Sequence, residues 1–396
     1  MGGALEGLRV LDLSRYIAGP YCAMLLADFG ADVVKVERPE GGDDARHNHP
    51  QIDGESLYYM ALNRNKRGIT LNFRHKDAQV LLRKLVAEAD VLIENFRPGT
   101  MEKMGCGWDE LRAINPRLIM ARISGFGQDG PLVNEPCFDP IAQAMSGLMD
   151  MTGQPDGKPT MIGTYIVDYS AAFMSTIGVL TALQHRTRTG LGQVVDASLL
   201  DSALSILTSA IPEQLLFNRG TTRIGNRDRN AAPGNSFQAR DGVWVHFNAG
   251  NAAHFPRLAN AMGRADLLSN PDFAASKTRL DNVDAIEAIV AAWVATVSSD
   301  DLLGLLKAAE VPAAKIATMA EVVEHPQVRH RDMIIDVQHP VAGRVPMAGI
   351  PFKLSESPGS IRLPAPTLGQ HNDEVLRDWL NCTHDDIAAL RAANAI

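Results

Sequence analysis

Short apolar runs alternate with amphipathic segments through the N-terminal part of the chain. Runs typical of β-strands cover residues 8–14, 32–38, 67–73, 91–96 and 117–127, and segments with helical spacing cover 21–30, 77–90 and 108–114. Such alternation predicts an α/β fold, a doubly wound parallel sheet with helices on both faces. Ligands bind at the carboxyl ends of the strands in sheets of this kind. Those ends here carry Arg15, Arg38, Asn95–Arg97 and Gly125.

One later segment, Tyr169–Gln184, carries no charge and is apolar almost all round. The pattern predicts a buried helix, which His185, Arg186 and Arg188 would end before Gly190. Asp168 then lies at the start of this helix, where its carboxylate would accept backbone N–H bonds and stay ionised. Two interpretations follow from this stretch alone: Asp168 is an N-cap, or it is a nucleophile or base held by a rigid helix.

The pattern changes from Asn226 to about Ile316. Residues 237–247 have the signal of a β-hairpin turning at Asp241-Gly242, and alanine-rich helical segments such as 283–297 follow. This region is interpreted as a smaller α+β domain. Strand-like segments and a proline-rich stretch lead from it to a final helix.

Composition narrows the function classes. The chain has 396 residues, of which 45% are hydrophobic and 21% charged. Its net charge of −8 argues against nucleic-acid binding as its main function. The cysteines Cys22, Cys106, Cys137 and Cys382 lack metal-ligand spacing, and no metal site is expected. With no segment resembling a signal peptide, the expected location is the cytoplasm. Serines and threonines in the uncharged helix favour a core helix over a membrane span.

No nucleotide motif accompanies the first strand. The turn RYIAGP has one glycine rather than a G-x-G-x-x-G pattern, and the chain has no phosphate-binding G-x-x-x-x-G-K-[ST] loop.

Several blocks together resemble the class III CoA-transferases, a family that includes formyl-CoA and carnitine CoA-transferases and is related to alpha-methylacyl-CoA racemase. The blocks are LEGLRVLDLSRYIAGPYCAMLLADFGADVVKVERPEGGDDAR, NRNKRGITLNF, ADVLIENFRPGTMEKMG, INPRLIMARISGFGQDGP, the Asp168 helix with RTRTGLGQVVDASLLDSAL, and APTLGQHNDEVLRDWL. They cover most of residues 5–205 and the C-terminal segment.

The resemblance implies a large Rossmann-like domain from residues 1–205 and 326–396, a small domain from 226–320, and linkers at 206–225 and 321–325. It also implies a homodimer of interlocked rings. Asp168 matches the family's catalytic aspartate. It would attack an acyl-CoA thioester, pass through a mixed anhydride and an aspartyl-CoA thioester, and give CoA to an acceptor carboxylic acid. Coenzyme A is then a substrate, and no permanently bound cofactor is expected.

By family position, further residues are expected to bind CoA. Arginine and lysine suit its phosphates, and Tyr16, Ile17 and Ala18 match the loop beside the thioester. The full set is Tyr16, Ile17, Ala18, Arg38, Leu71, Asn95, Phe96, Arg97 and Lys103. Solvated surface charge is the alternative for Arg97 and Lys103, and packing or turn formation is the alternative for Asn95 and Phe96.

Two positions depart from relatives. Ile17 replaces the glutamine of formyl-CoA transferase, so formyl-CoA and oxalate are disfavoured as substrates. Phe138 stands where racemases carry a histidine, and phenylalanine cannot transfer a proton. A 2-methylacyl-CoA racemase and an inactive CoA-binding paralogue remain alternatives, and Asp139 is interpreted as structural.

The remaining polar clusters are less specific. Arg46, His47 and His49 could hold an acidic substrate or form a solvated loop. Asn226–Asp228 could close over the cleft or make a turn or salt bridge, and Asn248–Asn251 is a candidate flap. Arg15, Arg46 and Arg64 suggest a dicarboxylate such as succinate as one substrate.

Overall fold

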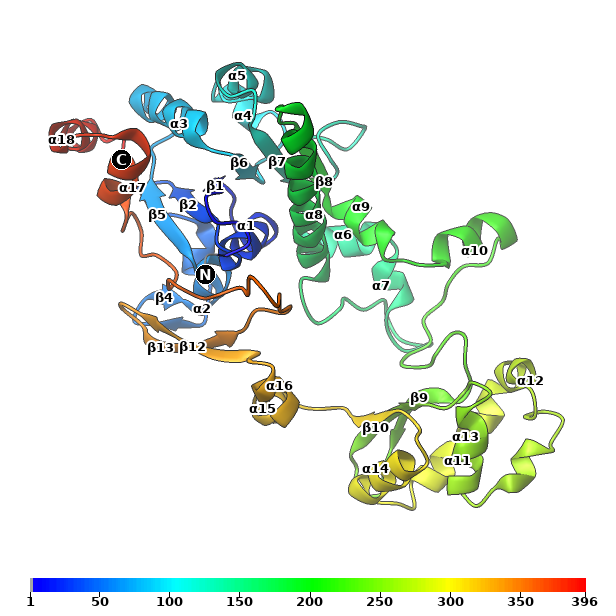
Figure 1. Cartoon of the computed structure of the whole chain (residues 1–396). Helices are drawn as coiled ribbons and strands as arrows, with labels where there is room; N and C mark the ends of the chain where they lie inside the picture. Colours follow the sequence, from blue (N-terminus) through cyan, green and yellow to red (C-terminus); the bar gives the residue numbers. More distant parts are fainter. Residues whose placement is uncertain (1–2) are drawn as a thin grey trace. The chain divides into compact units, whose positions relative to one another are not determined.

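The computed structural model describes residues 3–396, which form two compact units (Figure 1). The first unit contains the chain up to Leu148, Met161–Leu215 and Pro326–Ile396, and the second contains Met149–Thr160 and Leu216–His325. The short segment before Met161 belongs to the second unit because Arg223 pairs with Asp150 at 2.6 Å and Gly225 donates to the carbonyl of Gly153.

A six-stranded sheet with the order β5-β2-β1-β6-β7-β8 forms the centre of the first unit. Its strands are β1 (Arg9–Asp12), β2 (Asp32–Glu37), β5 (Lys66–Thr70), β6 (Val91–Glu94), β7 (Ile119–Ser124) and β8 (Val194–Ser198). All neighbouring strands are parallel, so the predicted parallel α/β sheet is confirmed. The edge strand β8 was not predicted from the sequence.

The chain leaves β1 toward β2 on one side and leaves β6 toward β7 on the other. The connections after β1 and β6 therefore diverge, and a crevice forms at the carboxyl ends of these two central strands.

Helices cover both faces of this sheet. Apolar side chains alternate along each strand, so Val10, Val33 and Val91 face α1 (Ala18–Asp28) and α8 (Ile166–Thr189). Leu11, Val34 and Leu92 face α3 (Lys76–Glu88) and α17 (Asn372–Leu380) on the other side. Burial on both faces is what a parallel sheet requires, and it explains the near-continuous apolar character of the strands.

The uncharged segment after Asp168 forms the long helix α8, as predicted, and the helix ends at Gly190, which has a φ of +76°. The prediction of a buried helix holds for only one side of α8 in the single chain. Small residues approach the sheet, since a Cβ on Gly178 would lie 2.5 Å from Val195. On the opposite side large apolar residues are 41–57% exposed: Phe173, Met174, Ile177 and Leu180.

Two features of the described residues meet the length and composition of a membrane span. They are α8 itself and a pair of helices bent by 117°, α13 (Val283–Val294) and α14 (Ser299–Ala308). The core helix of a globular protein meets the same criterion.

The C-terminal segment closes one edge of the sheet. The backbone N–H of Thr70 on β5 donates to the side chain of Asn372 at 2.8 Å, and the N–H of His371 donates to the carbonyl of Gly68 at 2.8 Å. Helix α17 and the following α18 (His384–Ala392) then pack beside α3. The described N- and C-terminal segments thus belong to one unit.

Shorter elements complete this part of the chain. They are η1 (Asp44–His47), β3 (Gln51–Ile52), β4 (Glu55–Ser56), α2 (Leu57–Asn63), α4 (Thr100–Lys103), α5 (Trp108–Ile114), α6 (Asp139–Met145), α9 (Leu199–Ser205), α16 (Pro326–His330), β12 (Ile334–His339) and β13 (Gly343–Ala348). Two further helices, α7 (Leu148–Met151) and α10 (Ala210–Phe217), begin in the first unit and end in the second. Strands β12 and β13 form an antiparallel hairpin, as do β3 and β4.

The second unit has a three-stranded antiparallel sheet, ordered β11-β10-β9, with helices packed on it. Its remaining elements are β9 (Gly234–Gln238), β10 (Trp244–Asn248), α11 (His254–Ala261), η2 (Ala265–Leu268), α12 (Ser276–Asp281), β11 (Ala313–Lys315) and α15 (Met319–Glu324). The predicted hairpin is confirmed: Gly242, in the turn between β9 and β10, has a φ of +81°, which glycine adopts without strain.

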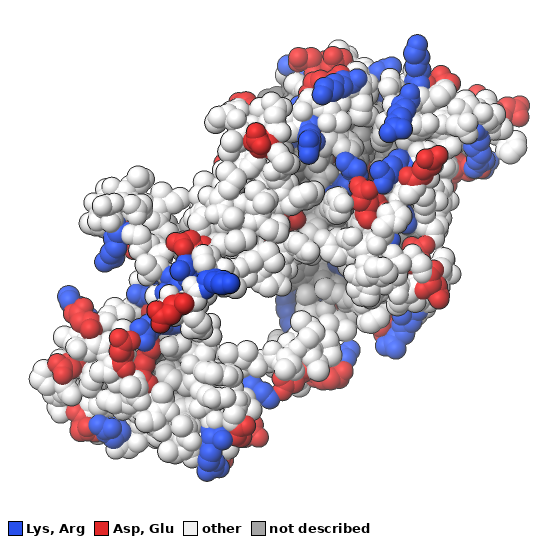
Figure 2. All heavy atoms as spheres, turned by 180° about the vertical axis from the view of Figure 1, so that it is seen from behind, with Lys and Arg blue, Asp and Glu red and all other residues white. Residues whose placement is uncertain are grey.

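Charged side chains of both signs are interspersed over the face shown in Figure 2, with broad uncharged areas between them. The four cysteines are free thiols, two of them buried. Within residues 3–396 no group of three or more His, Cys, Asp or Glu side chains is arranged to hold a metal ion.

Candidate active site

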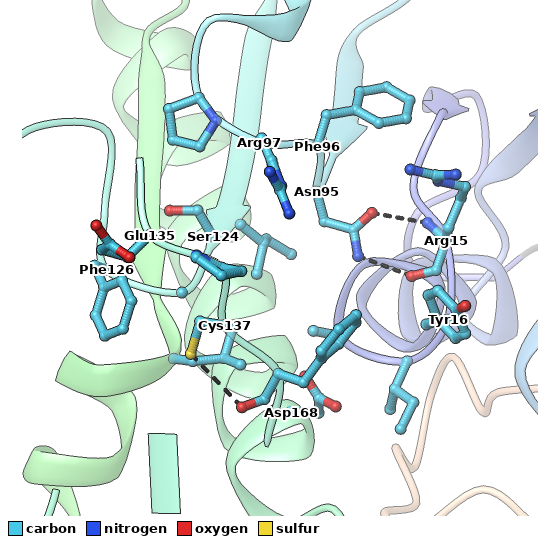
Figure 3. Close-up of a pocket in the computed structure, with 18 of the residues that line it drawn as sticks. Arg15, Tyr16, Asn95, Phe96, Arg97, Ser124, Phe126, Glu135, Cys137 and Asp168 are labelled. Atoms are coloured by element: carbon cyan, nitrogen blue, oxygen red, sulfur yellow. Dashed lines mark hydrogen bonds between the residues drawn. The ribbon is translucent and has the colours of Figure 1, made fainter. Parts of the chain in front are cut away.

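A cavity of about 200 Å³ opens at the carboxyl edge of the central sheet, where the topology predicts a ligand site (Figure 3). The loops after β1 and β6 contribute Tyr16 and Asn95, the last residue of β7 contributes Ser124, and α8 contributes Asp168. The sequence-predicted residues that line this cavity are Tyr16, Ile17, Ala18, Asn95, Phe96, Arg97 and Asp168. Most of the predicted set is therefore brought together by the connections after β1 and β6 and by the start of α8.

Asp168 lies in the first turn of α8, but it is not the helix cap. The carboxylate of Asp139, at the start of α6, accepts the backbone N–H of Val167 at 2.7 Å and that of Asp168 at 3.1 Å. The capping interpretation of Asp168 is corrected: a buried aspartate from another helix satisfies these donors, and the Asp168 side chain is left to line the cavity.

This arrangement also reverses the expected charge behaviour. Burial, followed by the negative charge of Asp139, raises the pKa of Asp168 from 3.8 to about 7. The expectation that Asp168 stays ionised because it accepts backbone N–H groups is wrong, since Asp139 takes those donors and no cation offsets the burial within the described chain. A partly desolvated carboxylate with a raised pKa is more basic and more nucleophilic than one in water.

Asp139 itself is held on the side away from Asp168. Its second oxygen accepts from the side-chain amide of Gln143 at 2.6 Å, and Asp139 is 1% exposed. These contacts agree with the structural interpretation of Asp139. The preceding Phe138 is 64% exposed and meets Tyr16 edge to face, with ring centroids 6.0 Å apart.

The loop after β1 is fixed by Asn95. Figure 3 shows its side chain bracketing Arg15: the backbone N–H of Arg15 donates to Asn95 at 2.8 Å, and the Asn95 amide donates to the carbonyl of Arg15 at 2.8 Å. Asn95 thus combines a place in the cavity wall with a turn-forming role that the sequence left as an alternative.

The predicted cationic and apolar CoA residues divide into two groups. Arg97 lines the cavity, whereas the structure does not bring Arg38, Leu71 or Lys103 to it. Arg38 is exposed and pairs with Asp44 at 2.6 Å, and Arg15 pairs with the other oxygen of Asp44 at 3.0 Å. Leu71 is fully buried in the core, and Lys103 ends the short helix α4.

Two of the three arginines suggested for a dicarboxylate are engaged elsewhere. Arg46 makes a bidentate pair with the buried Glu37, at 2.7 and 2.8 Å. Arg64 pairs with the buried Asp28 at 2.8 Å. The suggestion is corrected for Arg46 and Arg64, whose guanidinium groups hold the fold together; only Arg15 of the three lines the cavity.

The clusters of the second unit have structural partners. Arg227 pairs with Asp284 at 2.8 Å and Glu287 at 2.9 Å, and Asp228 accepts from Asn248 at 2.5 Å. The turn and salt-bridge alternative for Asn226–Asp228 is therefore the one with observed contacts.

Sequence reasoning missed two side chains near Asp168. Burial, together with the negative charge of Asp168, raises the pKa of Tyr58 far above its ordinary value. Burial and Asp168 also raise the pKa of the Cys137 thiol to about 11. Tyr58 lies five residues before Asn63, where the NRNKR block begins, but no spacing in the sequence relates it to a residue more than a hundred positions later.

Comparisons of the sequence and of the structure with known proteins identify one family. The profile of CoA-transferase family III matches residues 5–372. Succinyl-CoA--D-citramalate CoA-transferase of Chloroflexus aurantiacus is 41% identical over 393 residues, which cover 99% of this chain and 98% of that protein. Succinyl-CoA:mesaconate CoA-transferase of Haloarcula hispanica is 41% identical over 384 residues, which cover 94% and 96%. The crystal structure of a CAIB/BAIF family protein from Brucella suis superimposes with a TM-score of 0.85 at 36% identity, covering 96% of this chain and all of that one.

Proposed function

The chain belongs to CoA-transferase family III, and from this we propose that it moves coenzyme A from succinyl-CoA to another dicarboxylic acid with Asp168 as the covalent nucleophile. The observation that carries the proposal is the unpaired, desolvated carboxylate of Asp168 in a cavity at the switch point of the sheet. The substrate class is supported by the names of the two relatives, which combine succinyl-CoA with D-citramalate or mesaconate, both dicarboxylic acids.

The reaction proceeds in four nucleophilic exchanges. The Asp168 carboxylate attacks the thioester carbonyl, so a C–O bond forms, the C–S bond breaks, and CoA leaves as a thiolate. The thiolate attacks the carbonyl of Asp168 in the resulting mixed anhydride, releasing succinate and leaving an aspartyl-CoA thioester. The acceptor carboxylate attacks that thioester to give a second anhydride. The returning thiolate attacks the acceptor's acyl carbon, which yields the new CoA ester and restores Asp168.

The environment of Asp168 favours these exchanges. Each one needs the ionised carboxylate or the thiolate, and desolvation raises the nucleophilicity of Asp168 while limiting loss of the anhydride to water. Rigid attachment to the start of α8, which Asp139 caps, keeps the attacking oxygen in place.

Of the residues predicted from family position to bind CoA, we assign this role to those that line the cavity: Tyr16, Ile17, Ala18, Asn95, Phe96 and Arg97. Arg38 and Lys103 lie outside the cavity, and Leu71 is fully buried in the core. Seven other lining positions are apolar or aromatic, and Arg15 and Arg97 supply positive charge for a carboxylate or phosphate. The cavity volume of about 200 Å³ suits the reacting end of the thioester. CoA enters as substrate, and a permanently bound cofactor is not part of the proposal.

We also propose a homodimer of two interlocked rings, in which each subunit has a Rossmann-like large domain and a small domain. The exposed side of α8 supports an interface, because Phe173, Met174, Ile177 and Leu180 are apolar and 41–57% exposed. The end of α10 adds Leu215, Leu216 and Phe217, which are 70–79% exposed. The proposed domain division is 1–205 with 326–396, and 226–320, and the proposed location is the cytoplasm.

The nucleophile is tested by trapping. The protein is incubated with succinyl-CoA, treated with hydroxylamine and digested, and the expected result is a hydroxamate on Asp168 in the mass spectrum. Asp168→Asn should give none, and Asp156→Asn, which changes an exposed aspartate, should behave like the wild type. A protein that transfers CoA without modification of Asp168 would overturn the assignment.

The substrate class is tested by crossing succinyl-CoA with mono- and dicarboxylic acids and identifying the CoA esters by mass spectrometry. Dicarboxylic acceptors should give the highest rates. Solvent deuterium entering the alpha carbon of a 2-methylacyl-CoA without any acceptor acid would indicate the racemase instead, which Phe138 disfavours because it carries no exchangeable proton.

A further inference from the structure

The loop Ser14–Tyr16, which joins β1 to α1, has a conformation that its own sequence does not favour. Tyr16 has a φ of +62°, in the left-handed region that L side chains rarely adopt. Tyr16 and the next two residues, Ile17 and Ala18, line the cavity that contains Asp168. Strained backbone of this kind persists only where its surroundings hold it, and it concentrates at functional sites.

Side chains from three other segments hold the backbone of this loop. The ammonium group of Lys35 on β2 donates to the carbonyl of Ser14. Asn95 brackets the backbone of Arg15, as described above. The carboxylate of Asp43 accepts the N–H of Tyr16 at 3.2 Å. Each residue of the loop therefore has a backbone group fixed from outside.

Asp43 and Lys35 lie behind the cavity wall and do not touch the cavity. They form an ion pair of 2.9 Å, and they are 1% and 0% exposed. The oxygen of Asp43 that accepts from Tyr16 also accepts from Ala45 at 3.0 Å, and the backbone N–H of Asp43 donates to Glu37 at 2.8 Å. Asp43 is thus fixed in turn by three neighbours.

A buried pair such as this gives little net stability, because removing two charges from water offsets their attraction. Its atoms are instead directed at the backbone of one strained loop. We propose that Asp43 and Lys35 are positioning residues for CoA transfer, which keep Tyr16 in its left-handed conformation and thereby hold Ile17 and Ala18 against Asp168. The inference rests on the proposed function of Asp168.

Removal of the Asp43 carboxylate tests this role. Asp43→Ala should lower kcat by about 10–100-fold, because displacement of a cavity wall by about 1 Å disturbs the attack geometry. KM for succinyl-CoA should change less than kcat. Asp43→Asn keeps an oxygen acceptor for Tyr16 and should retain more activity than Asp43→Ala; if Asp43→Ala does not fold, Asp43→Asn replaces it in the comparison below.

A double-mutant cycle separates positioning from general stability. Glycine adopts the left-handed conformation freely, so in a Tyr16→Gly background the loss caused by Asp43→Ala should become several-fold smaller. If Asp43 had only a structural role, Asp43→Ala would lower kcat by the same factor in the wild-type and Tyr16→Gly backgrounds. Asp28→Ala is the matched control, because Asp28 is also 1% exposed and forms an ion pair, in its case with Arg64. This variant should unfold at a lower urea concentration but keep the wild-type kcat.

The outcomes are distinguishable from failure of the proposed function. If the wild type transfers CoA and traps hydroxylamine on Asp168 while Asp43→Ala keeps the wild-type kcat, or loses it by the same factor in both backgrounds, the positioning role is overturned and the nucleophile assignment stands. If the wild type forms no Asp168 adduct, the proposed function fails first.

Discussion

Asp12 and Asp168 are aspartates of the same unit, the first fully buried and the second partly buried, yet their electrostatic surroundings are opposite. Asp12, on β1, is fully buried between two lysines, with Lys66 at 2.8 Å and Lys35 at 3.9 Å. Burial alone would raise the pKa of Asp12, but the lysines outweigh burial and hold its pKa below the ordinary value. Asp168 has Asp139 as its charged neighbour, and its pKa rises to about 7.

The difference shows that burial raises the pKa of a carboxylate unless neighbouring cations outweigh it, as the two lysines do at Asp12. A paired aspartate is stabilised and made less nucleophilic, which suits a part of the scaffold. An unpaired aspartate costs stability and keeps its reactivity, which suits a group that must form a covalent bond. The fold places the first kind at the end of β1, where Asp12 accepts from Ser14 of the Tyr16 loop, and the second kind at the start of α8, where Asp168 lines the cavity.

The largest expected effect is the loss of activity in Asp168→Asn. CoA-ester formation, followed by mass spectrometry, should fall by at least about 10⁴-fold because the nucleophile is absent. Folding should not suffer. The folded-state pKa of Asp168 lies above 3.8, so ionisation costs stability as pH rises through about 7. The variant should therefore melt at or above the wild-type temperature at pH 8, and the gap should close near pH 4.

Asp12→Asn should lower the stability of the protein and leave the reactivity of Asp168 intact. It leaves Lys66 and Lys35 without their shared carboxylate, so the free energy of unfolding, measured in urea, should fall by about 3–5 kcal/mol. The acid Asp168 is not altered, and hydroxylamine trapping on the folded fraction should still label it. A stable Asp12→Asn protein would show that the lysines find other partners.

Asp139→Asn removes the negative charge beside Asp168 and so tests how much that charge contributes to the raised pKa of Asp168. Asparagine is also a good helix cap, so the N–H groups of Val167 and Asp168 keep an acceptor. In the wild type, kcat/KM should rise with pH through an apparent pKa of about 7, since the ionised Asp168 is the active form. The variant's profile should shift to lower pH because the negative neighbour is gone; an unchanged profile would assign the raised pKa to burial alone.

The smallest expected effect concerns Cys137. Burial and then the charge of Asp168 raise the pKa of its thiol to about 11, so alkylation by iodoacetamide at pH 8 should be slow. Asp168→Asn removes the charge and should speed labelling of Cys137 a few-fold. Labelling of Cys382, which has no contribution from Asp168, serves as the internal control.

The features that could be predicted from the sequence are mainly local. The end of α8 at Gly190 follows from nearby cations and a glycine, and the β9–β10 hairpin follows from Asp241-Gly242. The true cap of α8 could not be predicted, because Asp139 reaches Asp168 across 29 positions. The partners of Arg46 and Arg64 were hidden for the same reason: periodicity identifies a face of an element, whereas an ion pair between elements depends on how they pack.

The outer edge of β5 receives its hydrogen bonds from residues near the C-terminus of the chain, His371 and Asn372. During synthesis this edge therefore has no partner until after the whole second unit has left the ribosome. The nascent first unit carries an open parallel edge strand for most of its translation, a state prone to pairing with other chains. Sequence separations of about 300 residues also slow the final closure. The residues that cover this edge are thus made long after all six strands of the sheet.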